Sequence, residues 1–215
     1  MMVLMMALGQ PAQAKDICSN ANEAATNSAE IKAVYDESEA QRDKRAQGDA
    51  AVLAQDEKRI KQLLKRDAAG QLCTPEDKWH AAWVMQQADT LATLNRAYEL
   101  AVETMNAHLP RGPWLVAFSF DHKRVAAGYY QAYGTQTRIN NNGRRCLIEV
   151  EPTFTDEQRA QFGMPTLVET YRKQLDAAGF NEDEATEQRM RKRDLLCQPL
   201  AFRNVDRRRV APTAQ

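Results

Sequence analysis

The chain has 215 residues with 29 basic and 29 acidic side chains, so its formal net charge is zero. This balance excludes the overall basic field on which binding to nucleic acids and anionic membranes depends, and we expect no nucleic-acid partner. Charged residues form 27% of the chain and glycine only nine positions, which favours helices, and the length allows one domain or two small ones.

Residues 1–14 resemble a secretory signal peptide. The first eight residues are apolar, and Ala12-Gln13-Ala14 matches a cleavage site. A basic start is missing, which leaves the true start codon open, and an apolar start that is not cleaved is the alternative. The segment is too short to span a membrane, and no later run is long enough. We therefore expect a periplasmic or secreted protein that begins at Lys15.

Four cysteines follow the expected cleavage site, at Cys18, Cys73, Cys146 and Cys197. They are far apart, so no C-x-x-C motif for a metal or for redox chemistry is present, and we expect no metal and no cofactor. An even number of cysteines in an exported chain favours two disulfides. Three pairings are possible and stay open, as does the alternative of four free thiols.

The first part of the chain is helical in composition. Residues 15–48 form a charged, partly solvated helical region, and Gly48-Asp49 separates it from a helix at 50–67 that packs. We expect an α-helical domain at 49–180, followed by a charged helix and a disordered tail within 181–215. The short basic run near the end is most simply a solvated tail.

Three consecutive helices are predicted at 75–88, 91–109 and 113–128. Thr74 is a good N-cap and Pro75 suits the first helical position. The loops between these helices are short, which indicates antiparallel neighbours. The fold class is therefore mainly α, an antiparallel stack of helical hairpins that resembles helical-repeat proteins and carries one small β-hairpin.

Several polar residues on these helices are candidates for a site. On the first helix, Gln86 shares a face with two tryptophans, and Gln87 lies on another face with His80. Tryptophans in this pattern more often belong to a core than to a ligand site. His108, near the end of the second helix, is expected to cap it, because a cation is favoured there.

The helix at 113–128 carries an acid on its apolar stripe, which comprises Trp114, Leu115, Phe118, Val125 and Gly128. Asp121 falls on this stripe, and a buried carboxylate needs a partner. Arg124, three residues on, is one candidate, and a donor from a neighbouring element is the other. His122 follows directly, but adjacent helical residues diverge by about 100°, so the two side chains cannot share a narrow site.

A turn dense in tyrosine and glutamine follows this helix, between Tyr129 and Gln136. Its side chains suit either a pocket wall that orients a polar ligand or a packed loop that satisfies buried backbone, and both readings stay open. The candidate site comprises Asp121, His122, Gln131, Tyr133, Gly134, Thr135, Gln136, Gln86 and Gln87. We predict that Asp121 is buried and accepts hydrogen bonds from residues 131–136. Replacing it with alanine then costs about 2–4 kcal/mol, and with asparagine less.

The pattern changes to β after this turn. Two β-like runs lie within 133–151, and Asn142-Gly143 between them is a strong hairpin signal. Helices are expected again within 152–163, at 166–178 and at 182–195. In the first of these, Thr155 and Gln158 have the spacing of a capping box.

These motifs resemble the signature of the bacterial domain-of-unknown-function family 6624. Its apolar helix ends in Asp-Arg, and a spacer with Gly precedes Gln, an aromatic residue and Gly-Thr-Gln. The matching residues are Asp121, Gly128, Gln131, Tyr133, Gly134, Thr135 and Gln136. The Arg of the signature is His122 here. An upstream Gln-His element is matched by AAWVMQQAD, with Gln87 in place of the His, and a downstream element by EPTFTDEQRAQFGMPTL. The resemblance covers about residues 43–175 and implies no established reaction.

Two functions from different classes remain. The first is a binding or interaction module of the cell envelope, whose partner is an unknown protein or a small polar ligand. It is favoured by the balanced charge and by the absence of a recognisable nucleophile, metal or phosphate-loop motif. The alternative is a hydrolase in which Asp121 and His122 perform acid–base work on a small polar ligand. Whether the protein is an enzyme stays open.

Overall fold

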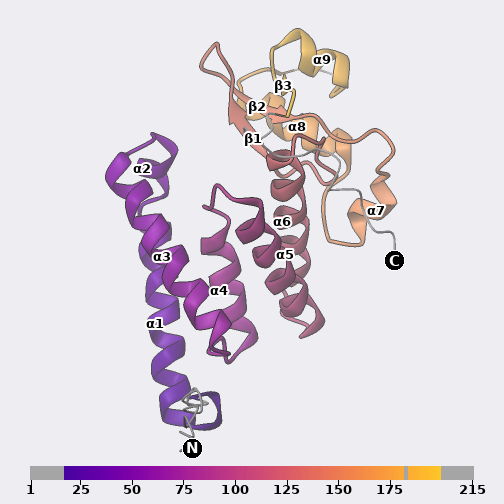
Figure 1. Ribbon diagram of the computed structural model, residues 1–215. Helices are drawn as coiled ribbons and strands as arrows, with labels where there is room; N and C mark the ends of the chain where they lie inside the picture. Colours follow the sequence, from indigo (N-terminus) through magenta and orange to yellow (C-terminus); the bar gives the residue numbers. More distant parts are fainter. Residues whose placement is uncertain (1–16, 182–183, 200–215) are drawn as a thin grey trace, which may run out of the picture.

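The computed structural model describes residues 17–181 and 184–199 and shows a mainly α-helical protein with one small sheet (Figure 1). Helices α1, α3, α4, α5 and α6 form one body, and the sheet with the last three helices lies beyond one end of α6. The predicted fold class is confirmed. The predicted signal peptide and the part of the predicted tail after residue 199 lie outside the described residues.

Short loops connect the helices from α1 to α6. After a 3-10 turn η1 (Ile17–Ser19), the helices are α1 (Ala21–Ala40), α2 (Arg42–Ala46), α3 (Ala50–Ala68), α4 (Pro75–Met85), α5 (Leu91–Asn106), α6 (Gly112–Ala126), α7 (Asp156–Ala160), α8 (Leu167–Ala177) and α9 (Glu187–Lys192). α5 packs against both α4 and α6, and α1 packs against α4. Five of these helices begin at a threonine whose hydroxyl accepts a backbone N–H, at Thr74, Thr90, Thr155, Thr166 and Thr186.

The main hydrophobic core lies among α1, α3, α4, α5 and α6. Its buried members include Ile31, Val34, Ile60, Leu63, Trp79, Val84, Met85, Leu100 and Leu115. Ile31 and Val34 belong to α1, whose apolar residues therefore pack into the bundle while its charged residues face solvent. Residues before and after position 48 thus share one core.

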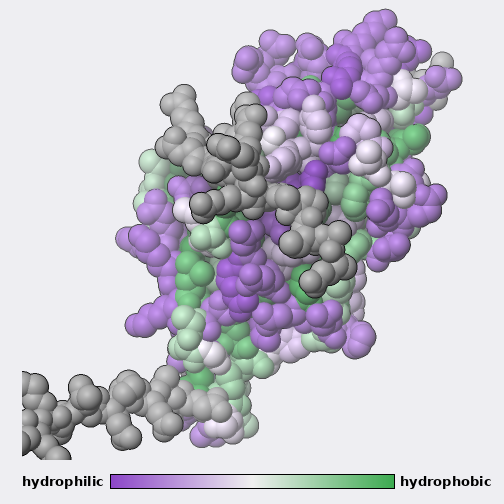
Figure 2. Space-filling model, turned by 45° about the vertical axis from the view of Figure 1, so that its right-hand side comes forward, coloured by the Kyte–Doolittle hydropathy of each residue, from purple (hydrophilic) through white to green (hydrophobic). Residues whose placement is uncertain are grey.

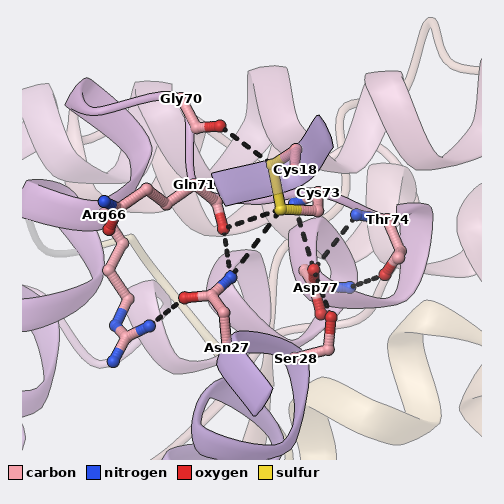
Figure 3. Close-up of a disulfide and its surroundings, with 9 residues drawn as sticks. All are labelled: Cys18, Asn27, Ser28, Arg66, Gly70, Gln71, Cys73, Thr74 and Asp77. Atoms are coloured by element: carbon pink, nitrogen blue, oxygen red, sulfur yellow. Dashed lines mark hydrogen bonds between the residues drawn. A yellow bond between two sulfur atoms is a disulfide. The ribbon is translucent and has the colours of Figure 1, made fainter. Parts of the chain in front are cut away.

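A disulfide between Cys18 and Cys73 fastens η1 to the segment that leads into α4 (Figure 3). Beside it, the buried carboxylate of Asp77 accepts hydrogen bonds from the Ser28 hydroxyl (2.9 Å) and from the N–H groups of Cys73 and Thr74 (3.0 Å each). Ser28 lies on α1, so this acid in the first turn of α4 also joins the two helices.

The predicted β-hairpin is present as β1 (Thr137–Ile139) and β2 (Arg145–Ile148), which pair antiparallel. A third strand, β3 (Leu196–Cys197), pairs parallel with β2 and was not predicted. Its two residues follow the last predicted helix and have no sequence pattern of their own. A disulfide between Cys146 and Cys197 connects β2 to β3. Of the three possible pairings, the structure therefore has Cys18–Cys73 and Cys146–Cys197.

The sheet, α8 and α9 enclose a second, smaller core. Its buried residues are Leu147, Val150, Tyr171, Leu175, Ala185, Met190 and Leu195. A third cluster, around Tyr133 and Ala117, lies between the two cores and includes side chains from α6 and from the loop after it. The polar turn that the sequence singles out is thus located at the junction of the helical body and the C-terminal part.

Several predicted helices end later than the observed ones. α4 ends at Met85, α5 ends at Asn106, and α9 stops at Lys192. His108 lies outside α5 with a φ of 59°, and the N–H of Leu109 reaches back to a carbonyl of the last turn. His108 thus ends the helix through its left-handed backbone, a position that glycine usually occupies.

The buried face of α6 differs from the predicted stripe. Trp114 is 38% exposed, and Phe118 and Val125 are only partly buried. Leu115 and Asp121 are buried as predicted, and the other buried residues of this face are Gly112, Val116, Ala117, Ser119 and Ala126. α5 runs along α6 and turns this broader face inward, which leaves Trp114 near the surface. The prediction for Asp121 is confirmed.

One face of the molecule is shown in Figure 2. Hydrophilic residues dominate the C-terminal part at the top of the view, and hydrophobic residues gather along the helices below. Among the described residues, no helix is both long and apolar enough to cross a bilayer.

Candidate binding site

Asp121 lies in the penultimate turn of α6 and holds the loop that follows. One carboxylate oxygen, Oδ1, accepts the N–H groups of Ala132 (2.6 Å) and Tyr133 (2.9 Å), and Oδ2 accepts the N–H (3.0 Å) and the hydroxyl (2.9 Å) of Thr135. The predicted hydrogen bonds from residues 131–136 are confirmed. The alternative partner, Arg124, instead donates to the carbonyl of Tyr130 at 2.7 Å.

The Asp121 side chain has no exposed surface. Burial raises the pKa of this carboxyl above its usual value, while the hydrogen bonds from the loop act in the opposite direction. Both oxygens are occupied by donors of the loop itself. The carboxylate therefore has no free lone pair directed at solvent with which to bind a ligand.

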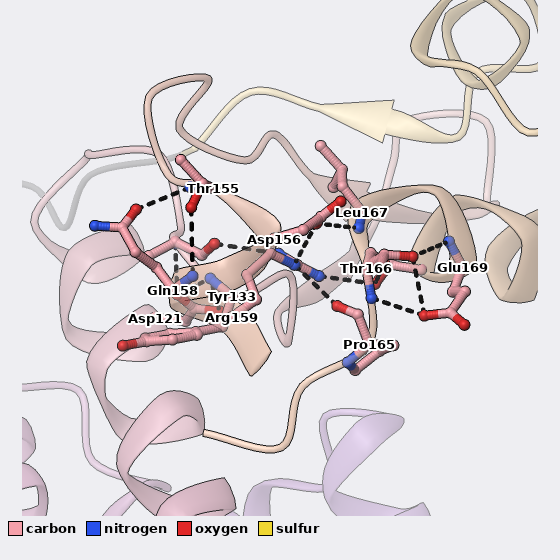
Figure 4. Close-up of polar contacts among 12 residues, drawn as sticks. Asp121, Tyr133, Thr155, Asp156, Gln158, Arg159, Pro165, Thr166, Leu167 and Glu169 are labelled. Atoms are coloured by element: carbon pink, nitrogen blue, oxygen red, sulfur yellow. Dashed lines mark hydrogen bonds and ion pairs between the residues drawn. The ribbon is translucent and has the colours of Figure 1, made fainter. Parts of the chain in front are cut away.

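Arg159 holds the same loop from the other side (Figure 4). Its fully buried guanidinium donates to the carbonyls of Ala132 (3.2 Å) and Pro165 (2.9 Å) and to the hydroxyl of Thr170 (2.9 Å). Ala132 thus has its N–H bound by Asp121 and its carbonyl bound by Arg159. Arg159 was not among the candidate residues. The available signal was its place in the capped helix TDEQR, which lies within the downstream family-like element.

The side chain of Gln131 also forms hydrogen bonds with the backbone of the loop and of β2. Gln131 is fully buried, and its amide accepts the N–H of Gln136 (2.7 Å) and donates to the carbonyls of Gln136 (3.1 Å) and Ile148. Gln131 thereby fastens the loop to β2. Tyr133 is buried against Phe120, Phe154 and Phe162, and burial raises the pKa of its hydroxyl.

These contacts decide between the two interpretations of the turn, a pocket wall that orients a ligand and a packed loop. Asp121, Gln131 and Tyr133 form a sealed cluster rather than the wall of an open pocket. Three cavities among the described residues lie elsewhere, and none of these three is lined by Asp121, Gln131 or Tyr133. This part of the candidate site is therefore a packed junction that joins the helical body to the C-terminal part.

Gly134 offers a direct test of how tightly this junction is packed. Its φ is +76°, and an added Cβ would lie 3.2 Å from Thr170 Cγ2 and 3.3 Å from Arg159 Nη2. Gly134→Ala is expected to lower the free energy of unfolding by about 2–3 kcal/mol, from backbone strain and displacement of the guanidinium together. Gly143→Ala is the matched control, since its φ is +73° and nothing lies within 4 Å. It should cost about 1 kcal/mol. If Gly134→Ala and Gly143→Ala lost equal free energy in urea unfolding, the Arg159 guanidinium would move aside at no measurable cost.

His122 points away from this junction, as the helical geometry predicts. Its Nδ1 lies 3.1 Å from Gln86 Oε1, and the Gln86 amide donates to the Ser119 hydroxyl at 2.7 Å. Burial lowers the pKa of His122 to about 4, so its imidazole is neutral at pH 7. Because the Gln86 oxygen can only accept, Nδ1 carries the proton and Nε2 keeps its lone pair.

A group of stacked aromatic rings lies beside this histidine, on α4 and α6. The centroids of Trp114 and Phe118 are 5.1 Å apart with planes 18° from parallel, and Trp83 lies 5.4 Å from each of them. We call Trp83, Trp114 and Phe118 the aromatic ledge. Trp114 is its exposed member. Arg111 covers a fourth ring, Trp79, at 3.9 Å, and Trp79 stacks on Trp83.

Polar side chains surround the aromatic ledge. The amide of Gln136 donates to the backbone carbonyl of Phe118 (3.3 Å) and to the Thr135 hydroxyl (3.0 Å), and so links the ledge to the sealed junction. The indole N–H of Trp83 donates to Glu39 at 2.6 Å. Gln87 follows directly after Gln86 and is partly exposed. The structure thus divides the predicted site into a sealed part around Asp121 and a partly exposed part around His122.

The described residues contain no group of three or more histidine, cysteine, aspartate or glutamate side chains that could hold a metal ion. No family model, no curated protein and no solved structure matches the chain. Its function has to be inferred from the residues themselves.

Proposed function

We propose that this chain is an exported binding module of the cell envelope, and that its aromatic ledge binds a small polar ligand with one flat apolar face, such as a sugar ring. The observation that carries the proposal is the exposure of Trp114, whose ring stacks on Phe118 and Trp83. Aromatic faces offer a large apolar surface at little entropic cost, and nearby polar groups can orient a ligand.

The polar groups near the ledge suit such a ligand. His122 is neutral and keeps an acceptor nitrogen, and the partly exposed Gln136, whose amide N–H donates to the Phe118 carbonyl and the Thr135 hydroxyl, has an amide oxygen that can accept. These groups recognise hydroxyls rather than charges. The Glu39 carboxylate beside Trp83 is already paired with Arg42, and a neutral polar ligand is therefore favoured over an anion or a cation.

Two disulfides support the exported location, because disulfides persist in oxidising compartments and are rare in the cytosol. They agree with the apolar start and the Ala-Gln-Ala pattern of the sequence. A periplasmic or secreted protein would meet glycans and other envelope components in this environment.

We further propose that the chain belongs to the bacterial domain-of-unknown-function family 6624, and that the shared signature is a folding motif. Its support is that Asp121, Gly134, Thr135 and Arg159, which come from two separate sequence elements, meet in the sealed junction. The hydrolase alternative has less support, because the Asp121 oxygens are occupied and His122 faces the other way.

The test is binding of N-acetylglucosamine and its trimer, followed by tryptophan fluorescence and calorimetry. Wild-type protein is expected to give a saturable change, and Trp114→Ala should weaken binding by at least about tenfold, the equivalent of one lost stacking contact. Leu53→Ala is the control, because Leu53 is also a large exposed apolar residue and lies on α3. An unchanged affinity in Trp114→Ala, or no saturable response to either sugar, would contradict the proposal.

A further inference from the structure

A second, separate cavity of about 400 Å³ lies in the C-terminal part of the molecule. The turn between β1 and β2 borders it on one side, and the C-terminal end of α8 borders it on the other. Its apolar lining comes from Ala177, Ala178, Phe180 and Leu195. The volume is within the range of small-molecule sites. The lining residues come from three stretches of the chain, at 144–145, 174–180 and 195.

Two guanidiniums, those of Arg144 and Arg145, line the same cavity. Neither forms an ion pair with a described carboxylate: one Arg144 nitrogen donates to the carbonyl of Arg193, and one Arg145 nitrogen donates to the Thr137 hydroxyl, each at 3.1 Å. A guanidinium has five N–H donors, so most donors of both arginines remain for a ligand. Many other arginines of this chain are paired with carboxylates, such as Arg45 with Asp56 at 2.5 Å.

The positions of the two arginines are set by the surrounding structure. The Gln174 amide donates to the backbone carbonyl of Arg145 at 2.7 Å, and the Cys146–Cys197 disulfide holds the next residue of β2 to β3. Asn140, in the turn, donates to the carbonyl of Asp194 at 2.9 Å. Because the backbone around the two arginines is already fixed, a ligand loses less binding free energy to ordering it.

The wall of the cavity opposite the two arginines bears on the charge of the expected ligand. Ala177 and Ala178 are the last helical residue and the C-cap of α8, and the carbonyls of a helix C-terminus carry a partial negative charge. The two guanidiniums suit the oxygens of a carboxylate or a phosphate alike. The partial negative charge at the end of α8 opposes the two charges of a phosphate dianion more strongly than the one charge of a carboxylate. We propose that this cavity binds a small monocarboxylate with a short apolar chain, the carboxylate at Arg144 and Arg145 and the chain against Phe180 and Ala178.

Calorimetry with hexanoate on the intact, oxidised protein tests the site. Saturable binding is expected, and Arg144→Gln and Arg145→Gln should each weaken it by about tenfold, the loss expected for one charge-assisted contact. Lys173→Gln is the control, because Lys173 is an exposed cation on α8 that does not line the cavity. Ala178→Leu, which fills the cavity without a change of charge, should abolish binding.

Three results would overturn the proposal. The first is an absence of saturable hexanoate binding to the wild-type protein. The second is hexanoate binding that both arginine variants and Ala178→Leu leave unchanged, which would place the ligand elsewhere. The third is tighter binding of inorganic phosphate than of hexanoate, lost in the arginine variants, which would make the cavity a phosphate site. Urea unfolding of each variant confirms that it is folded before binding is compared.

Discussion

Asp121→Ala is expected to lower the free energy of unfolding by about 3–5 kcal/mol, one of the two largest effects that we predict. This exceeds the loss expected from the sequence alone, because four separate groups donate to the carboxylate. The substitution leaves the N–H groups of Ala132, Tyr133 and Thr135 and the Thr135 hydroxyl without their acceptor, at a position where the Asp121 side chain has no exposed surface. The loop that these groups fix joins the helical body to the C-terminal part. Loss of these hydrogen bonds should therefore destabilise both the helical body and the C-terminal part.

Asp121→Asn is expected to recover only part of this loss. The sequence alone suggested a smaller loss than for alanine, because asparagine keeps an acceptor. In the structure both carboxylate oxygens accept, so the asparagine amide must direct N–H donors either at Ala132 and Tyr133 or at Thr135. We expect Asp121→Asn to lower the free energy of unfolding by about 2–3 kcal/mol relative to wild type, which is less than the loss for alanine.

Urea unfolding of wild type and of the two Asp121 variants measures these losses. Asp176→Ala is the control, because Asp176 is an exposed acid on α8 whose side chain has no hydrogen bond among the described residues. It should unfold within about 0.5 kcal/mol of wild type. If Asp121→Ala matched this control, the junction would be stable without its carboxylate and the hub role of Asp121 would be wrong.

Removal of either disulfide is the other large effect. The cysteines of the two pairs are separated by 55 and 51 residues, so loop closure in the unfolded chain predicts nearly equal losses of about 4 kcal/mol for Cys18→Ala/Cys73→Ala and for Cys146→Ala/Cys197→Ala. Because the loops are matched, any difference in urea unfolding reports on the folded state. Losses under about 1 kcal/mol for both would show that neither bridge constrains the unfolded chain.

The two bridges should also differ in their reduction. Cys146 and Cys197 are 0% and 6% exposed, whereas Cys18 and Cys73 are partly exposed. A thiolate has to reach a sulfur, so a mild reductant is expected to open Cys18–Cys73 first. Alkylation followed by peptide mapping gives the order. Opening of Cys146–Cys197 first would mean that the C-terminal part exposes its bridge more readily than its burial indicates.

The aromatic ledge and the sealed junction have different functional meanings. Perturbed, buried titratable groups often mark functional sites, and Asp121 has both properties. Its donors come from the loop itself, so its role is to hold the fold together. The adjacent His122 is partly buried, and under the proposed function it is the residue that a ligand on the aromatic ledge would contact.

Local chemistry made much of this fold predictable from sequence. Thr74 and Pro75 specify the start of α4, and Thr155 with Gln158 specifies α7, because a cap needs only residues three apart. Asp121 could be recognised as a hub because helical spacing placed a carboxylate on an apolar stripe, and the cost of burying it required nearby donors.

Tertiary structure decided the rest, where the partners are distant in sequence. Arg159 became a buried clamp because its acceptors come from three segments, and the two residues of β3 became a strand because β2 lies beside them. Trp114 is exposed because α5 turns another face of α6 inward. Disulfide pairing likewise depends on which cysteines the fold brings together, with Cα atoms 5.3 and 5.8 Å apart, and no spacing along the chain encodes those distances.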